Sequence, residues 1–185
     1  IPPYVDLGLS VKWATCNVGA TKPEEYGDYF AWGETEPKTD YRWFYYKWCN
    51  CEYGTGILTL TKYCNNSEFG NNGFTDTKTT LDPEDDVAHV QWGGTWRMPT
   101  MADWDELRKN CIWTWYSSDN TEFNGVAGYK VTSNIAGYRD RFIFLPAAGS
   151  RENTSPYNAG TLGNYWSSTL YTESPIWAWF IVFES

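Results

Sequence analysis

Three motifs near the C-terminus decide how this chain is interpreted: Leu145-Pro146-Ala147-Ala148-Gly149, Gly163-Asn164-Tyr165-Trp166-Ser167-Ser168-Thr169 and Trp177-Ala178-Trp179-Phe180-Ile181-Val182-Phe183. Pro, which restricts the backbone, and Gly, which gives it more freedom, alternate here with Trp and with clusters of mixed side chains. This alternation is typical of a rigid frame that displays a binding surface. The sequence therefore favours a binding protein over a catalyst.

The last motif has the period of two that is typical of a β-strand. Its two faces consist of Trp177, Trp179, Ile181 and Phe183, and of Ala178, Phe180, Val182 and Glu184. If the first face packs inward, Phe180 and Val182 point outward, and two large apolar side chains on an open face indicate a contact patch. The alternative is a strand buried on both faces.

Composition indicates one folded domain over residues 1–185. That length is sufficient for one sizeable core, and a hydrophobic content of 42% argues against disorder. Aromatic residues make up 19% of the chain, including 12 Trp and 14 Tyr. These are too many to be hidden in one core, and exposed Tyr and Trp are favourable contact residues.

The net charge of −9 disfavours a nucleic-acid partner, because phosphate binding requires an excess of Lys and Arg on one face. The mixed basic and aromatic segment Tyr41–Trp48 holds only two cations, so we expect a core strand there. No apolar stretch is long enough to predict a transmembrane segment.

Five cysteines give an odd count, so at least one is not paired within the chain: Cys16, Cys49, Cys51, Cys64 and Cys111. Cys49, Cys51 and Cys64 together with His89 could form a metal site. The one-residue gap between the first two is not the spacing of zinc knuckles. We therefore expect buried thiols, with or without one disulfide, and neither a metal nor a cofactor.

Further strands are predicted from alternating or apolar runs at Val5-Asp6-Leu7, Val11-Lys12-Trp13, Asp28–Trp32, Tyr129–Ser133 and Arg141–Leu145. The last run is nearly all apolar, which indicates a central strand. Residues 49–80 are rich in Asn, Gly and Thr and predict a long loop or an insertion.

A first helix is predicted to begin at Asp82-Pro83-Glu84-Asp85-Asp86 and to end at Gly93-Gly94. Asp82 is the expected N-cap, and the acids that follow suit the positive end of the helix dipole. Calcium binding by Glu84, Asp85 and Asp86 is the alternative, but the dipole alone explains these acids.

A second helix is predicted from Thr100, where Asp103 takes the place of the usual Glu in a capping box. Met101, Trp104, Leu107 and Cys111 recur at helical spacing and predict a buried stripe. Two helices flanking short, mostly antiparallel strands with long loops make an α+β fold.

Five motifs together resemble the Fibrobacter succinogenes major paralogous domain family, which is common in cell-surface proteins of gut Bacteroidetes. They are Val5–Ala14, Gly27–Glu34, Trp92–Thr100, Leu145–Gly149 and Tyr165–Ser168, and the resemblance covers nearly the whole chain. It implies a C-type lectin-like fold, in the branch shared with formylglycine-generating enzymes. The calcium-sugar motif of true lectins is absent, so the fold does not imply carbohydrate binding.

The same architecture carries the variable proteins of diversity-generating retroelements, in which the C-terminal segment is rewritten at chosen codons. The resemblance therefore implies that residues 145–185 form the ligand-binding segment. Its frame would consist of Gly149, Gly163, Trp166, Ser167, Ser168, Trp179, Ile181 and Phe183. The interleaved candidate binding residues are Ser150, Arg151, Glu152, Tyr157, Leu162, Tyr165, Leu170, Tyr171, Thr172, Glu173, Ile176, Phe180 and Val182.

We therefore expect a ligand-binding or adhesion domain at the cell surface or in secreted form, with any lipid anchor lying outside this chain. The expected partner is an extracellular protein or a glycan. The alternative is a structural cell-envelope or pilus-tip module without a ligand of its own.

An enzyme of the formylglycine-generating type is less favoured, because that chemistry needs a reactive cysteine pair. Cys111 falls on the stripe that is predicted to be buried, and His89 is the only histidine. The carboxylate pair Asp103 and Glu106 is better explained as surface acids of a helix than as glycosidase groups.

Overall fold

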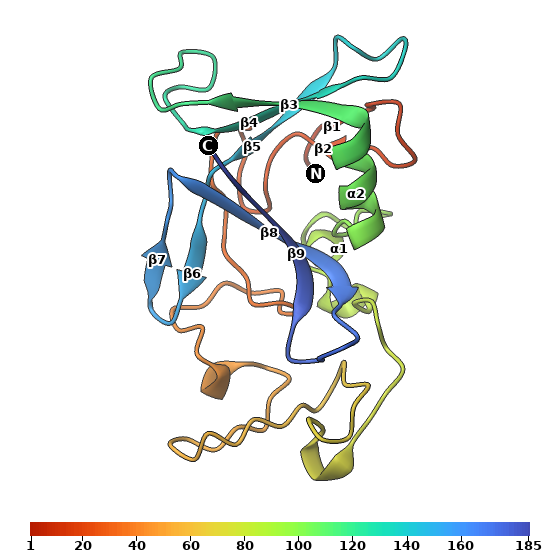
Figure 1. The fold of residues 1–185 in the computed structure, drawn as a ribbon, viewed down its shortest axis with the longest axis vertical. Coiled ribbons are helices and arrows are strands. Elements are labelled where there is room, and N and C mark those ends of the chain that lie inside the picture. The colour runs from red at the N-terminus through yellow and green to blue at the C-terminus, as the bar shows by residue number, and fades with distance from the viewer.

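The computed structural model describes residues 1–185 and combines a few helices with several small antiparallel sheets (Figure 1). This confirms the α+β class. The helices are α1 (Val87–Trp92) and α2 (Met101–Asn110). The strands are β1 (Tyr4–Val5), β2 (Trp13–Ala14), β3 (Cys111–Tyr116), β4 (Gly128–Ser133), β5 (Phe142–Pro146), β6 (Ser150–Glu152), β7 (Ser155–Tyr157), β8 (Leu162–Leu170) and β9 (Ala178–Glu184).

Strands β3, β4 and β5 form a three-stranded sheet at one end of the molecule, with β4 in the middle (Figure 1). The prediction of a central strand at Arg141–Leu145 is therefore wrong, because β5 pairs only with β4. Ile143, Phe144 and Leu145 are nevertheless all buried. The apolar run reflects packing of side chains on both faces, not pairing of the backbone on both edges.

The long hairpin of β8 and β9 crosses the middle of the molecule (Figure 1). The main core lies next to it and contains Leu7, Trp13, Trp104, Leu107, Val131, Ile143 and Leu145. Ile181 and Phe183 of β9 pack against this core, as the sequence predicts. The N-terminal strands, α2 and the C-terminal hairpin thus share one apolar interior.

The predicted start of α2 is confirmed in detail. Thr100 Oγ1 accepts a hydrogen bond from the Asp103 backbone N–H at 3.2 Å, and Asp103 Oδ2 accepts one from the Thr100 N–H at 2.8 Å. Trp104 and Leu107 are buried, as expected for the apolar stripe. Cys111 lies beyond the helix and begins β3.

The start of α1 differs from the prediction. A 3₁₀ turn at Pro83–Asp85 precedes the helix, and the N-cap is Asp86, which accepts from the His89 N–H at 3.1 Å. Asp85 is buried and accepts hydrogen bonds of 2.7 Å from Lys62 Nζ and from the Tyr63 hydroxyl. The ion pair with Lys62 of the long loop, and not the helix dipole, therefore explains why an acidic residue stands at position 85.

The N-terminal half contains less sheet than predicted. Asp28–Trp32 has no regular structure, and Tyr41–Trp48 contains only a 3₁₀ turn at Trp43–Tyr45. The predicted long loop of residues 49–80 is confirmed and lies at the end of the molecule opposite the three-stranded sheet (Figure 1). Aromatic content misled the strand predictions, because these side chains fix the chain through hydrogen bonds to distant backbone.

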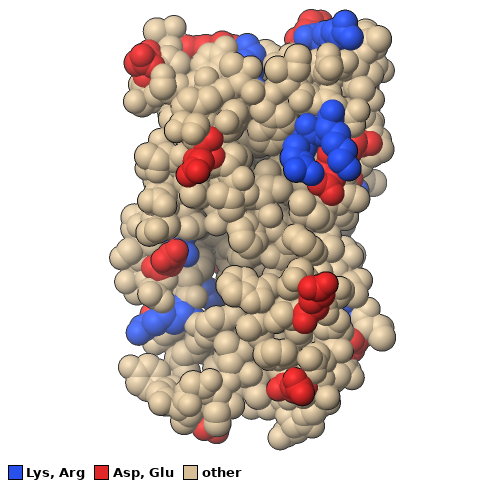
Figure 2. Space-filling model, in the orientation of Figure 1, with Lys and Arg blue, Asp and Glu red and all other residues tan.

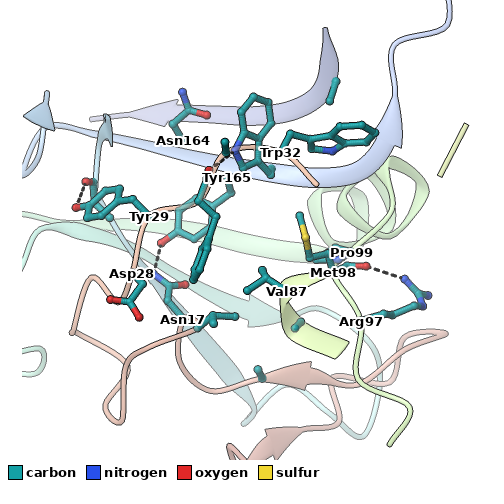
Figure 3. A pocket seen from close by; sticks show the side chains of 18 of the residues that line it. Asn17, Asp28, Tyr29, Trp32, Val87, Arg97, Met98, Pro99, Asn164 and Tyr165 are labelled. Atoms are coloured by element: carbon teal, nitrogen blue, oxygen red, sulfur yellow. Dashed lines mark hydrogen bonds between the residues drawn. The ribbon is translucent and has the colours of Figure 1, made fainter. Parts of the chain in front are cut away.

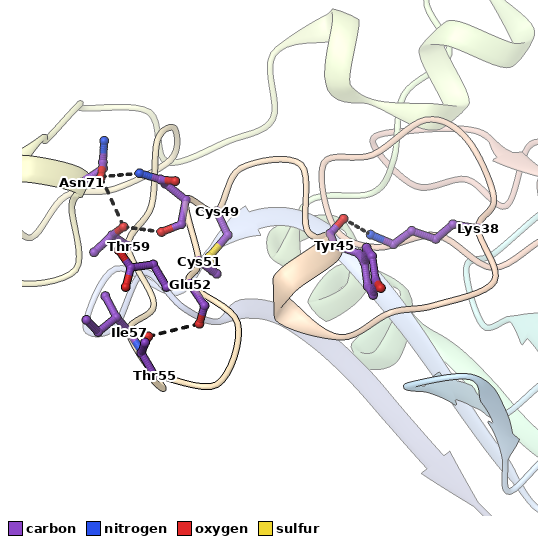
Figure 4. Close-up of a disulfide and its surroundings, with 10 residues drawn as sticks. Lys38, Tyr45, Cys49, Cys51, Glu52, Thr55, Ile57, Thr59 and Asn71 are labelled. Carbon is purple, nitrogen blue, oxygen red and sulfur yellow. Dashed lines mark hydrogen bonds between the residues drawn. A yellow bond between two sulfur atoms is a disulfide. The ribbon is translucent and has the colours of Figure 1, made fainter.

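Cys49 and Cys51 form a disulfide within the long loop (Figure 4). Because their sulfurs bond to each other, they are not available for the metal site that the sequence left open. Cys16 and Cys64 are buried free thiols, and Cys111 is half-buried. No helix of the chain combines the length and the apolar character that crossing a bilayer requires.

Candidate functional site

A cleft of ≈ 850 Å³ lies between the irregular N-terminal segment, the turn before α2 and the C-terminal segment (Figure 3). Most of the residues that line it are hydrophobic, and many are aromatic. We call it the aromatic cleft and define it by Trp13, Tyr29, Trp32, Trp96, Trp166 and Trp177.

Four of the cleft's aromatic side chains, Tyr29, Trp32, Tyr165 and Trp166, donate from their polar ends to backbone carbonyls. The Tyr29 hydroxyl donates to the carbonyl of Ala148 at 2.8 Å, and the Trp166 indole N–H donates to Phe30 at 3.0 Å. These bonds join the irregular N-terminal segment to the C-terminal segment. They also leave the aromatic walls with few free donors.

Tyr165, a candidate binding residue, is half-buried in the lining of the cleft. Its hydroxyl donates to the Pro146 carbonyl at 2.8 Å and accepts from Asn17 Nδ2 at 3.1 Å (Figure 3). Its ring packs against Trp104 and Phe183. Burial raises the pKa of Tyr165 well above its ordinary value of 10.0. Tyr165 is therefore part of the cleft wall and not of the outer surface.

Leu170 is a second correction. Only 1% of it is exposed, and it packs with Trp32, Tyr63, Leu81 and Ala178 in a smaller core cluster. Leu170 ends β8, after a register shift that separates its pairing with Ala178 from the pairing of Trp166 with Phe180. Leu170 is therefore a core residue and is removed from the candidate surface.

Three of the candidate residues lie at the rim of the aromatic cleft: Ser150, Arg151 and Ile176. The guanidinium of Arg151 lies over the ring of Tyr29, 5.4 Å from its centroid, and forms no ion pair with a carboxylate. These side chains can contact a molecule that enters the cleft.

Other candidates lie outside the cleft, around β9. Phe180 is 36% exposed and Val182 is 50% exposed, which excludes a strand buried on both faces. Trp177 and Trp179 are also exposed, contrary to the predicted inward face, and Ala178 is buried in their place. The register shift in the hairpin breaks the strict alternation on which the prediction depended.

Four exposed side chains of this region and the half-buried Tyr171 form what we call the C-terminal platform: Tyr171, Trp177, Trp179, Phe180 and Val182. The rings of Tyr171 and Trp179 meet edge to face, with centroids 5.0 Å apart. The Tyr171 hydroxyl donates to Glu173 at 2.6 Å, so this partly exposed side chain is held in place. The platform combines large contact area with limited side-chain freedom.

The remaining candidates are dispersed. Thr172 and Glu173 are exposed in the turn between β8 and β9, next to the platform. Glu152 and Tyr157 are exposed on the hairpin of β6 and β7, and Leu162 is half-buried opposite Glu184. The structure therefore divides the predicted site into a cleft rim, a platform and a separate hairpin.

Sequence reasoning missed an exposed aromatic group at the 3₁₀ turn. Trp43, Phe44 and Tyr45 are each more than 40% exposed, and Tyr53 of the long loop packs edge to face against Phe44. Lys38, which donates to the Tyr45 carbonyl, holds the turn near the disulfide loop (Figure 4). The absence of alternation in Tyr41–Trp48 was the available signal that this segment is not a strand.

The groups considered for catalysis, Cys111, Asp103 and Glu106, are at least half-buried or engaged in hydrogen bonds within the fold. Burial raises the pKa of the Cys111 thiol to about 11, which leaves almost no thiolate at neutral pH. Asp103 Oδ2 is bonded to Arg97 and to Thr100, and Glu106 accepts two hydrogen bonds from Ser10. This geometry favours structural roles for the carboxylate pair.

Charged side chains on the face shown in Figure 2 lie singly or in small groups of both signs, separated by broad uncharged areas. Comparison of the chain with protein-family models, with curated proteins and with solved structures finds no match. The function is therefore argued from the geometry of the cleft and the platform.

Proposed function

We propose that this chain is a cell-surface or secreted binding domain with a C-type lectin-like fold, which contacts an extracellular protein or glycan through its C-terminal platform. One observation carries the proposal: Trp177, Trp179, Phe180 and Val182 are all exposed within one short segment of β9 and the turn before it. A group of exposed large apolar side chains is typical of interaction sites.

The chemistry of the platform suits recognition. Trp and Tyr supply large contact areas with few rotatable bonds, and neighbouring Thr172 and Glu173 supply adaptable hydrogen bonds. The platform also rests on a rigid support. Trp104 of α2 donates to the Trp166 carbonyl at 3.2 Å, and Ser167 Oγ donates to the Trp179 carbonyl at 2.6 Å. Little ordering of the backbone would then oppose binding.

Diversification of the C-terminal segment, as in retroelement variable proteins, belongs to the same proposal. Frame positions are constrained by packing: Gly149 has a φ of +66°, and a Cβ on Gly163 would overlap the ring of Phe183. Interleaved positions such as Arg151, Tyr157 and Val182 are exposed. Substitutions at the exposed positions would leave the frame intact, which is the physical requirement for a diversified surface.

The proposal is tested by screening the whole chain against an array of extracellular glycans and a panel of secreted and surface proteins. For any ligand found, Tyr171→Ala should weaken binding by about 1–2 kcal/mol, as expected for a hot spot at the edge of a contact. The triple variant Tyr171→Ala/Phe180→Ala/Val182→Ala should weaken it further.

The matched control is Ile112→Ala on β3, which removes an apolar side chain about as exposed as that of Val182 (55% against 50%). Binding that is weakened as much by this control as by the triple variant would place the contact elsewhere. Failure of every array and panel to give a ligand would favour the structural cell-envelope module.

A further inference from the structure

We propose that the aromatic cleft binds a small, uncharged, mainly apolar organic molecule that contains a ring system. This inference goes beyond the proposed function, because the contact with an extracellular partner depends on the platform, whereas this site depends on the cleft. The two share only Trp177, which belongs to both. Four features of the cleft support the assignment.

The first feature is size. A volume of ≈ 850 Å³ lies within the range of roughly 300–1,000 Å³ that is usual for small-molecule sites. It corresponds to nearly thirty water molecules at about 30 Å³ each. A single amino-acid side chain from a partner would fill only a small part of this space, so a whole ligand suits it better.

The second feature is the apolar character of the walls. Of the 43 residues that line the cleft, 29 are hydrophobic, so water inside has few groups to which it can bond. An apolar ligand that displaces this water gains the hydrophobic contribution without breaking many hydrogen bonds. Flat Trp and Tyr side chains also offer ring faces for stacking.

The third feature is that most polar ends of the aromatic walls are already bonded, which argues against a sugar stacked on these walls. The hydroxyls of Tyr29 and Tyr165 and the indole N–H groups of Trp32 and Trp166 already donate to backbone carbonyls. Hydroxyl groups of a sugar that face these aromatic walls would find few hydrogen-bond partners, and this is unfavourable. Apolar rings carry no such penalty.

The fourth feature concerns charge and one remaining donor. Three of the six charged groups in the lining are already paired: Arg97 with Asp103 at 2.7 Å, and Glu34 with Lys38, outside the lining, at 2.6 Å. The other three, which form no ion pair, are all exposed residues: Lys12, Asp28 and Arg151. The buried side-chain polar atom that lacks a hydrogen-bond partner is Nε1 of Trp13, which also belongs to the lining. One acceptor oxygen on an otherwise apolar ligand would complement it.

The experiment uses the whole chain and N-phenyl-1-naphthylamine, an uncharged dye whose fluorescence rises in an apolar site. We expect saturable binding of one dye per chain, accompanied by quenching of the cleft tryptophans through energy transfer. Ser150→Trp and Thr95→Trp each introduce an indole into the lining, from β6 and from the exposed turn before Trp96 respectively. Both should weaken dye binding at least tenfold.

The matched control is Thr121→Trp, which adds the same side chain at an exposed position outside the cleft and should leave the affinity unchanged. Thermal melting verifies that each variant folds. If Ser150→Trp does not fold, Thr95→Trp alone tests the proposal, because Thr95 is exposed and its replacement does not disturb the core. Wild-type affinity in a folded cleft variant would overturn the proposal, and so would the absence of saturable binding to the wild-type chain.

A second probe tests the preference for an uncharged ligand. 8-Anilinonaphthalene-1-sulfonate has the same ring system with an added sulfonate, and we expect at least tenfold weaker binding. Equal affinity for both dyes would overturn this part of the assignment. The dye experiments test the cleft alone and use no platform variant. A negative result with the dyes would therefore not bear on the proposed contact between the platform and an extracellular partner.

Discussion

Trp32 donates its indole N–H to the backbone carbonyl of Ser167, at 2.7 Å and across 135 residues of sequence. Trp166, next to Ser167, donates in return to the carbonyl of Phe30 at 3.0 Å. These two reciprocal bonds hold an irregular segment against β8 as strand pairing would. The same two bonds hold one wall of the aromatic cleft in place and also hold β8, which supports the platform.

We expect Trp32→Phe to lower the free energy of unfolding by about 1–3 kcal/mol, because the buried Ser167 carbonyl loses its donor. Urea unfolding measures the difference. Trp177→Phe is the control, since Trp177 is 57% exposed and its indole N–H has no partner, and its effect should be within about 0.5 kcal/mol. Equal effects of the two variants would show that the bond contributes nothing.

Leu170→Ala should lower the free energy of unfolding by about 2–5 kcal/mol, because the side chain is buried and its removal leaves a cavity. Val182→Ala, at a position that is 50% exposed, should change stability by less than about 0.5 kcal/mol. Chemical unfolding of both variants checks the division of the candidate residues into core and surface. A neutral Leu170→Ala would contradict it.

The capping carboxylate of α2 should make stability depend on pH. Although burial raises the pKa of Asp103, hydrogen bonds from Arg97 and Thr100 outweigh it and hold the pKa below its ordinary value of 3.8. A lowered pKa in the folded state contributes stability that is fully present above pH 3.8 and is lost as the pH falls through the folded value. Asp103→Asn should therefore be less stable than the wild type at pH 7, and the difference should shrink in acid. A difference that does not change between pH 7 and pH 2 would contradict this.

The free thiols should react slowly in the folded protein. Burial raises the pKa of Cys16, Cys64 and Cys111, so little thiolate is present at neutral pH. We expect Ellman's reagent to label these thiols slowly in the native chain and rapidly in urea, without reductant. One thiol that reacts rapidly in the native state would support the enzyme alternative.

Anionic polymers should bind weakly, because the net charge of −9 repels them and the repulsion grows as salt is lowered. Heparin and duplex DNA, titrated at low and at physiological salt, measure this. Tight, salt-sensitive binding of either polymer would be inconsistent with the charge distribution.

Local sequence signals predicted the elements that local chemistry controls. Thr100 and Asp103 form the predicted capping box, and Gly93, with a φ of +71°, ends α1 as expected. Alternation placed Ile181 and Phe183 against the core. It failed at Trp179, because a register shift that depends on the partner strand changes which side chains face inward.

The sequence by itself determined the α+β class, the two helices and an aromatic content too large for one core, because capping, periodicity and composition act over a few residues or over the whole chain. Only the tertiary structure decided that Leu170 is buried, that Tyr165 lies in the cleft wall and that Tyr29, Trp32 and Trp166 meet around this cleft. These positions depend on hydrogen bonds and packing between segments more than a hundred residues apart. A pattern read along the chain does not specify which distant carbonyl an indole or a phenol will reach.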